Sequence, residues 1–412
     1  MRLLNNSGGE DLEVLRSISA HIQVVPPVLY PELHSGARGL LDLDQELNKG
    51  SQALNSIDDN GRAPLHWACQ SGNISAMKSL LEAGADPNIK DGDGQTPLMT
   101  ASYRGDRTCV AVLLNTTACM VNATDNRGST ALHFAARSPS SCASDLVKML
   151  LCHGAAATHP NNSGETALHE LASSYTEMVT FEELWKRANA LLEAGACIEA
   201  TDRWNYTPAL QAVAETNHVA LKVLASFHAR LDRTDCDRMS VLHLTALYGK
   251  LESIEVIEES QISNLDIESL DGQEDTPFGL IEWRTVANLS GLTPWIAPNE
   301  AEIGAFKQLL QNIRNRNLEL DIALSHSAIM ALKRGDRALA KKIISEIVDK
   351  YMLWIKDKEF EAFRTIMIDL SDGTGGIALQ KMEELIHFWQ KRIKIDLFKD
   401  AWCETLHKRT DM

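Results

Sequence analysis

Two stretches of this 412-residue chain place acidic residues beside glycine, which is the chemistry of a calcium loop. They are residues 58–61, Asp-Asp-Asn-Gly, and residues 91–94, Asp-Gly-Asp-Gly. An EF-hand loop also needs a glutamate at its twelfth position. Counted from Asp91, that position holds Ser102, so we interpret both stretches as turns and predict no metal there.

Four histidines recur at regular spacing and could together suggest a metal site: His66, His133, His169 and His243. If each lies on its own helix of a stack, neighbouring histidines are roughly 10 Å apart, which is too far for one ion. We therefore predict a structural role for all four, and the sequence indicates no cofactor.

A glycine-rich stretch at residues 371–376 precedes a predicted helix and could hold a phosphate. No strand is predicted before it, and it lacks the P-loop and Rossmann spacings, so we predict a turn between two helices. The chain also contains no GxSxG, no HExxH, no kinase loop set and no DHHC cysteine box. The sequence therefore predicts a noncatalytic protein.

The recurrent histidines end copies of one tetrapeptide. It reads Ala-Pro-Leu-His at 63–66, Thr-Pro-Leu-Met at 96–99, Thr-Ala-Leu-His at 130–133 and 166–169, and Ser-Val-Leu-His at 240–243. These starts, with the related ones at Thr207 and Thr276, are 33 to 41 residues apart, and each follows a short polar turn. Self-similarity at one period indicates a small unit stacked on itself.

The unit at residues 58–88 resembles the ankyrin consensus, down to its closing Gly-Ala-Asp-Pro-Asn. The repeat style also resembles that of fungal ankyrin repeat-containing proteins. This resemblance implies an all-α ankyrin-repeat solenoid of helix–turn–helix units with β-turn fingers, followed by a helical C-terminal extension. It also implies that each tetrapeptide histidine bonds backbone and ties adjacent loops together. We expect threonine to cap the first helix of a unit and proline to open it.

We expect three regions along the chain. Residues 1–53 lack the repeat and are predicted to be an N-terminal helical cap or arm, an F-box-type adaptor motif being the alternative. Residues 54–283 are predicted to be an array of about seven units. The fifth and seventh are degenerate, because the fifth lacks the turn glycine and the seventh has it displaced.

Residues 284–412 are predicted to be helical at 301–315, 323–333, 338–351, 360–370 and 379–399, including a degenerate ankyrin-like helix pair near 319–350. The last helix carries a broad apolar stripe that must be buried: Met382, Leu385, Ile386, Trp389, Ile393 and Leu397. A C-terminal cap of the array is our first interpretation, and a dimer or partner interface is the second.

Composition limits the compartment and the partners. The formal net charge is −16, which disfavours direct binding to nucleic acid or to anionic lipid. No apolar run approaches the ~18 residues that span a bilayer, and no signal-peptide core follows Met1. Eight scattered cysteines with no repeated spacing indicate reduced thiols. We expect a cytoplasmic or nuclear protein; the sequence leaves the oligomeric state open.

The variable positions of the resembled family lie at the turn tips and on the first helices, where a concave face grips protein partners. Trp, Tyr and Arg are the residue types enriched at interface hot spots. We predict that partner binding uses Arg62, Trp67, Gln70, Tyr103, Arg104, Phe134, Arg137, Arg203, Trp204 and Tyr206. Trp67 and Phe134 could instead pack onto neighbouring helices. The group of arginines on an acidic protein would suit an acidic peptide.

The function that these patterns favour is a noncatalytic scaffold or adaptor that binds another protein through the concave ankyrin face. One alternative is an enzyme, or a regulatory subunit of one, with its activity in residues 284–412. Another is a transcription-related cofactor that acts through protein contacts and does not touch DNA itself.

Overall fold

The computed structural model describes residues 54–174, 179–261, 265–289, 298–351, 358–371 and 375–393. Within these ranges every regular element is an α-helix, apart from one isolated bridge between Thr234 and Ser240. The expected all-α ankyrin solenoid is therefore confirmed. The chain divides into two compact units, one made of the residues up to 135 with 152–155, and the other of 136–151 with 156 onwards.

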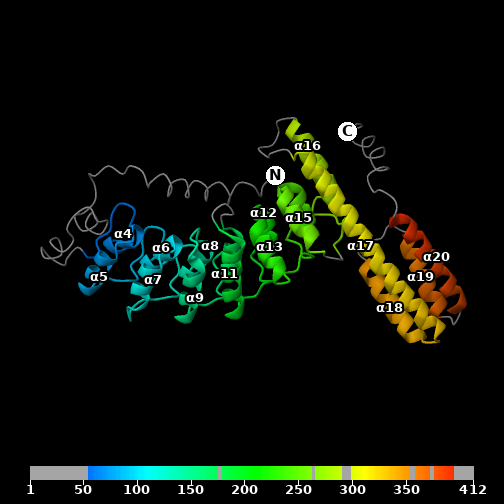
Figure 1. The fold of residues 1–412 in the computed structure, drawn as a ribbon, viewed down its shortest axis with the longest axis horizontal. Helices are drawn as coiled ribbons and strands as arrows, with labels where there is room; N and C mark the ends of the chain where they lie inside the picture. The colour runs from blue at the N-terminus through cyan, green and yellow to red at the C-terminus, as the bar shows by residue number, and fades with distance from the viewer. Residues whose placement is uncertain are drawn as a thin grey trace. The chain divides into compact units, whose positions relative to one another are not determined.

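The first unit holds two complete helix pairs, α4 (Pro64–Ser71) with α5 (Ile74–Glu82) and α6 (Pro97–Arg104) with α7 (Arg107–Leu114). Helix α4 packs on α5 and on α6, and α5 packs on α7, as Figure 1 shows. Leu65, Met77 and Leu80 are fully buried between these helices. This burial is the main source of stability for helices that are too short to persist alone.

The repeat residues perform the predicted local roles. The hydroxyl of Thr96 accepts a bond from the backbone of Met99 at the start of α6, and proline occupies the first position of both α4 and α6. Both helices end at a glycine in the left-handed conformation, Gly72 with φ 70° and Gly105 with φ 77°. Glycine adopts this conformation without the strain that a Cβ atom causes.

The polar turns of the first unit form a ladder of backbone hydrogen bonds. Asp91 closes its own turn by accepting bonds from the backbone of Asp93 at 3.0 Å and Gln95 at 2.9 Å. The N–H of Gly92 donates to Asn60, and that of Asn126 donates to Asp93, each at 3.0 Å. The acidic residues are thus used in turns, as the sequence predicted.

The second unit continues the same pattern with more irregular sequences. Its helices in the array are α10 (Ala167–Ala172), α11 (Phe181–Glu193), α12 (Pro208–Ala214), α13 (His218–Ser226), α14 (Val241–Tyr248), α15 (Leu251–Glu259) and α16 (Pro277–Leu289). Helices α8 (Ala131–Arg137) and α9 (Ala143–Cys152) cross the boundary between the units. First helices pack on first helices, α10 on α12 and α12 on α14, and α14 on α16.

The degenerate turns keep the turn conformation without glycine. Asn205, Arg238 and Glu274 have φ of 65°, 60° and 66°, in the places where earlier turns have Gly61 or Gly94. Asp202 still closes its turn by accepting from the backbone of Trp204 and Tyr206. Loss of the glycine therefore changes the strain of the turn and leaves its shape intact.

Three buried side chains donate hydrogen bonds to carbonyls at the ends of first helices that lack a left-handed glycine. Arg187, which is fully buried, donates to the carbonyls of Ala136 and Ser138 at 3.2 and 2.6 Å and also to Ser140. Its partner Glu183 accepts from the backbone and hydroxyl of Ser144.

The other two side chains act in the same way. The amide of Asn217 donates to the carbonyls of Ala172 at 2.9 Å and Ser174 at 2.7 Å, beyond α10. The guanidinium of Arg284 donates to Ala246 at 3.2 Å, in the last turn of α14. In each case the donor comes from the following repeat and satisfies carbonyls that the helix end leaves open.

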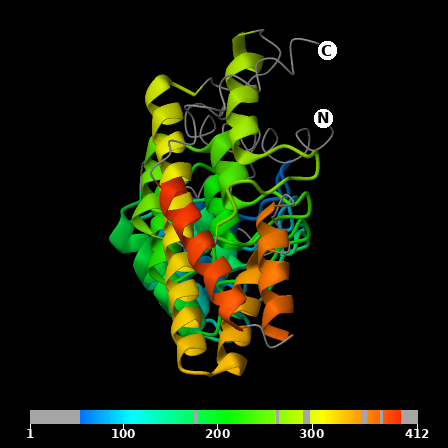
Figure 2. The ribbon, with the colours of Figure 1, turned by 90° about the vertical axis from the view of Figure 1, so that its right-hand side faces the viewer.

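Four helices follow the array in the second unit: α17 (Glu300–Lys333), α18 (Arg337–Tyr351), α19 (Lys358–Ser371) and α20 (Gly375–Ile393). Helix α17 packs against α15 of the array and also against α18 and α20, and α19 packs against α18 and α20 (Figures 1 and 2). The predicted stripe of the last helix is part of this core, since Met382, Leu385, Ile386 and Trp389 are buried.

The structure corrects one expectation for this region, because the separate helices predicted at 301–315 and 323–333 are one continuous helix of 34 residues. Near 319–350, α17 and α18 meet around Gly335, which has φ of 82°, and they have 34 and 15 residues where α4 and α5 have 8 and 9. Residues 1–53, Leu397 and the centre of the 371–376 turn lie outside the described residues.

Candidate functional site

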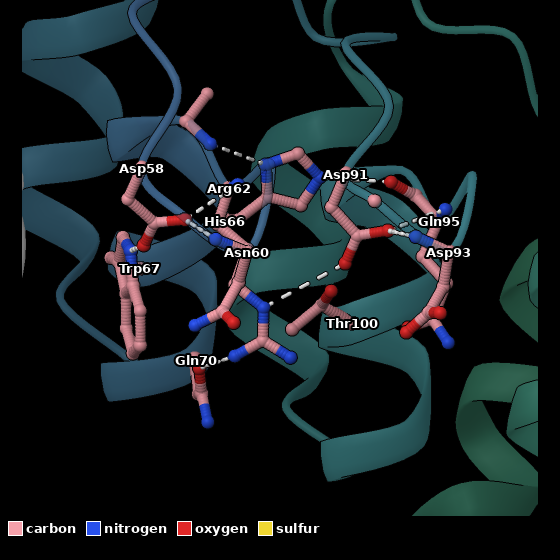
Figure 3. A network of polar contacts seen from close by, with 12 residues as sticks. Asp58, Asn60, Arg62, His66, Trp67, Gln70, Asp91, Asp93, Gln95 and Thr100 are labelled. Atoms are coloured by element: carbon pink, nitrogen blue, oxygen red, sulfur yellow. Dashed lines mark hydrogen bonds and ion pairs between the residues drawn. The ribbon is translucent and has the colours of Figure 1, made fainter.

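Trp67 is an internal part of the first repeat (Figure 3). Only 7% of the residue is exposed, and its indole Nε1–H donates to the Asp58 carboxylate at 2.9 Å. The same carboxylate accepts from the backbone of Asn60 and Arg62 through its other oxygen. The indole of Trp67 is thus used in folding the turn onto α4, and its predicted contact with a partner stays a prediction.

Arg62 lies above this tryptophan and is held from three sides. Its guanidinium carbon is 5.2 Å from the Trp67 ring centroid, its Nη1 donates to Gln70 at 2.8 Å, and its Nε lies 3.7 Å from the Asp91 carboxylate. Figure 3 shows these partners converging from two successive repeats. Arg62 and Gln70 thus form a fixed polar surface whose geometry exists before any partner arrives.

The tetrapeptide histidines have the structural role that the sequence predicted. Nδ1 of His66 accepts from the backbone of Ala63 at 3.1 Å, which leaves Nε2–H to donate to Gln95 of the next turn at 2.9 Å. Burial lowers the pKa of His66, so the ring stays neutral and keeps this arrangement. His169 and His243 make the same pair of contacts, to Tyr206 and Asp275, and burial lowers the pKa of both.

An aromatic pair marks the accessible part of the first unit. Tyr103 on α6 and Phe134 are both half-buried and meet edge to face, with ring centroids 6.5 Å apart. Arg104, the next residue of α6, is exposed. The structure therefore brings two predicted contact residues, Tyr103 and Phe134, together as an aromatic ledge, and a third, Arg104, is exposed at the end of the same helix as Tyr103.

The predicted residues of the second unit form two smaller groups. The guanidinium of Arg203 lies 3.9 Å from the Trp204 ring centroid at the tip of the fifth turn, with Arg203 exposed and Trp204 half-buried. Arg137 lies 3.5 Å from the carboxylate of Glu170. Burial and the nearby Asp235 carboxylate raise the pKa of Tyr206, which is half-buried.

Two exposed apolar residues at the last turn and helix were absent from the predicted set. Trp283 on α16 is 43% exposed, and Leu270, which directly precedes the last turn, is 49% exposed. The signal was available in the sequence, because Trp283 follows Thr276 by seven residues just as Tyr103 follows Thr96. The degenerate seventh turn obscured this register.

Few other features of the described residues suggest chemistry. No group of three or more His, Cys, Asp or Glu side chains among them could hold a metal ion. None of the helices in these ranges is long and apolar enough to cross a membrane. Desolvation raises the pKa of the Asp266 carboxyl to about 7, although its Oδ1 accepts a bond from the backbone of Glu268 at 2.7 Å.

A protein-family model matches part of this chain. The family model described as "Ankyrin repeats (3 copies)" matches residues 37–91 and 65–159. The matched segment consists of ankyrin repeats. The fungal affiliation that the sequence suggested is not settled by this match.

Curated relatives share only part of their length with this chain. Human "Transient receptor potential cation channel subfamily A member 1" is 29% identical over 143 residues, 34% of this chain and 12% of that protein. Human "SH3 and multiple ankyrin repeat domains protein 2" is 36% identical over 130 residues, 31% of this chain and 7% of that protein. An ankyrin repeat-containing protein of Schizosaccharomyces pombe is 33% identical over 97 residues, 23% of this chain and 42% of that protein.

Among solved structures, the human ASB11 ankyrin repeat domain aligns with a TM-score of 0.43 and 26% identity. It covers 52% of this chain and 91% of that chain. The chain thus spans less than half the length of each of these three curated relatives.

Proposed function

We propose that this protein is a noncatalytic scaffold or adaptor that binds another protein through the turns and first helices of its ankyrin repeats. Ankyrin repeats generally mediate protein–protein interaction and are generally noncatalytic. The observation that carries the proposal is the aromatic ledge of Tyr103 and Phe134 on a unit that also exposes Arg104. Aromatic residues and arginine are the residue types enriched at binding hot spots.

The partner segment that we propose is acidic. Arg104 is exposed at the end of α6, and Arg62, on the same unit, is paired with Asp91 and has a side chain that is 26% exposed. Because the whole chain carries a net charge of −16, the exposed Arg104 contrasts with the rest of the chain and would orient an acidic segment. Such binding should weaken as salt screens the charges.

Preorganisation supports a binding role for the fixed part of this surface. The hydrogen bonds of Arg62 and Gln70 and the edge-to-face contact of Tyr103 hold these side chains in place in the free protein. An immobilised side chain otherwise costs about 0.5–1.5 kcal/mol of ordering on binding. In the second unit, Arg203 stacked on Trp204 offers a further contact of the same chemistry.

We propose a cytoplasmic or nuclear location. The cysteines in the described ranges are all free, and Cys69 and Cys109 are buried with their thiol pKa values raised by burial. Free cysteines in a chain of this size are typical of a reducing compartment. A fungal-type repeat style is also proposed, and one relative from Schizosaccharomyces pombe supports it.

The experiment measures binding of two labelled peptides by fluorescence anisotropy, one alternating Glu with Tyr and one alternating Lys with Tyr. We expect the full chain to prefer the acidic peptide. Tyr103→Ala and Arg104→Glu should each weaken its binding about tenfold or more while the melting temperature changes little. Lys78→Glu makes the same charge change at an exposed position of α5 and serves as the matched control.

Binding of the acidic peptide that neither Tyr103→Ala nor Arg104→Glu weakens would contradict the proposed site. Equal loss in Arg104→Glu and Lys78→Glu would show that only net charge matters, and the ledge would then have no specific role.

A further inference from the structure

The last two repeats carry apolar side chains at the positions where the first two carry polar, aromatic or basic ones. Seven residues after the residue that precedes the first helix, repeats one and two have Gln70 and Tyr103. The same position holds Leu247 in repeat six and Trp283 in repeat seven. Equivalent positions of successive repeats lie in a row, so the row changes its chemistry along the chain.

These two residues lie on neighbouring helices of the second unit. Helix α14 carries Leu247 and packs against α16, which carries Trp283. Leu247 is half-buried and Trp283 is 43% exposed. A large aromatic ring that is nearly half exposed beside a leucine is an apolar surface that gains free energy when covered.

The turns that precede these two helices add two more apolar side chains. Met239 is half-buried and occupies the place in its turn that Arg62 occupies in the first. Leu270, 49% exposed, directly precedes the turn of repeat seven. A hydrogen bond of 2.6 Å from the backbone of Gly272 to Asp237 joins the two turns.

The rim of this surface is acidic. The two turn tips carry Asp237, Glu274 and Asp275; Glu274 is exposed and the other two are half-buried. Residues 235–239 and 271–275 together contain five acidic side chains and one basic side chain, Arg238, which donates to the carbonyl of Asp271 at 2.8 Å. The field at the rim therefore favours a positively charged segment.

We propose that repeats six and seven form a second protein-binding surface, separate from the ledge of the first unit and opposite to it in charge preference. Its occupant is a protein segment in which large apolar side chains alternate with or are flanked by Lys or Arg. The apolar side chains would cover Leu247, Trp283 and Leu270, and the basic groups would meet Asp237 and Glu274. Apolar anchors with a complementary charged rim are the general pattern of specific interfaces.

The test uses the full chain and three labelled 14-residue peptides that alternate Leu with Lys, Leu with Glu, or Ser with Lys. Fluorescence anisotropy should show binding of the Leu/Lys peptide that depends on Trp283, and no Trp283-dependent binding of the other two peptides. Trp283→Ala should weaken that binding about tenfold or more, as loss of an aromatic anchor does. The double variant Asp237→Asn with Glu274→Gln changes charge alone and should weaken it severalfold, with an unchanged circular dichroism spectrum. Tyr103→Ala should leave it unchanged, so failure of this proposal is distinguishable from failure of the proposed function.

Three results would overturn the proposal. The first is binding of the Leu/Glu peptide that Trp283→Ala weakens as strongly as it weakens binding of the Leu/Lys peptide. The second is binding of the Leu/Lys peptide that is indifferent to both the Trp283 and the charge variants. The third is concentration-dependent self-association in analytical ultracentrifugation that Trp283→Ala abolishes, because the surface would then be covered by a second copy of the chain.

Discussion

The early and late repeats of this array end their first helices by different means. Helices α4 and α6 end at Gly72 and Gly105 in the left-handed conformation, which lets the backbone satisfy its own carbonyls. Helices α8, α10 and α14 end beneath Arg187, Asn217 and Arg284, each supplied by the following repeat. Helix α12 is the exception among the later first helices, because it ends at a left-handed residue, Thr216. The carbonyls at the ends of first helices are thus satisfied in two ways: by backbone N–H groups of the next residues, or by a side chain that is distant in the sequence.

The difference teaches where sequence variation is tolerated. A glycine end fixes one residue and leaves the neighbouring repeat free to vary. Where a side chain from the next repeat satisfies the last carbonyls, the helix needs no glycine at its end. Its stability then depends on one buried polar group, whose loss leaves several carbonyls unsatisfied. The late repeats should therefore be more sensitive to single substitutions at these donors.

The largest expected effect is that of Arg187→Ala. It removes the donor to Ala136 and Ser138 and leaves the buried carboxylate of Glu183 without its cation. We expect about 3–5 kcal/mol of destabilisation, measured by urea unfolding followed by circular dichroism. The neighbouring exposed Lys186→Ala should change stability by less than about 0.5 kcal/mol. Similar unfolding midpoints for the two variants would remove the proposed difference between early and late repeats.

A smaller effect is expected for Trp67→Phe, which keeps the aromatic bulk and removes the indole donor to Asp58. The unpaired carboxylate oxygen should cost about 1–3 kcal/mol. Trp283→Phe makes the same chemical change at the exposed tryptophan and should change stability much less. Differential scanning calorimetry of both variants would test this, and an unstable Trp283→Phe would show that Trp283 is also a folding residue.

The carboxyl of Asp266 gives a pH-dependent prediction confined to the second unit. Its pKa is raised by desolvation from an ordinary 3.8 to about 7, so the folded state keeps a proton that the unfolded chain releases. The stability that this group contributes is present at low pH and is lost as pH rises from about 4 to 7. Asp266→Asn mimics the protonated form, so it should stabilise the protein by about 1 kcal/mol or more at pH 8. Urea titrations at pH 4.5 and 8 should show a difference that shrinks at the lower pH; a pH-independent difference would contradict this assignment.

The smallest expected effect comes from exchanging threonine and glycine at two left-handed helix ends. Thr216 follows α12 with φ of 56°, a strained conformation for a β-branched residue. Thr216→Gly should be neutral or stabilising by up to about 1 kcal/mol, whereas Gly105→Thr should destabilise by about 1–2 kcal/mol. Thermal melts of both variants test the pair, and equal effects of the same sign would refute the backbone argument.

The fold could be predicted from the sequence because each repeat encodes its turn and helix start locally. Asp91, Thr96 and His66 act within a few residues or on the next turn, so a short motif carries their roles. The contact of Arg187 with Ala136 spans 51 residues, and no local sequence pattern predicts it.

The candidate site was predictable only in part, for the same reason. Position in the repeat identified Tyr103, Arg104 and Phe134, but it gave no information on burial. Trp67 turned inward because Asp58 lies where it can accept the indole proton. The continuous α17 was missed because residues 316–322 were judged as a break, although Leu318 and Asp321 are buried in one unbroken helix.

The most direct test of the central claim, that the array binds proteins through two surfaces of opposite charge preference, is one selection from a random peptide display library on the immobilised full chain. The account predicts two classes of selected peptides. One is acidic and aromatic and is lost when the selection is repeated on Tyr103→Ala, and the other is basic and apolar and is lost on Trp283→Ala. Enriched peptides without charge bias, or classes unaffected by either substitution, would contradict it.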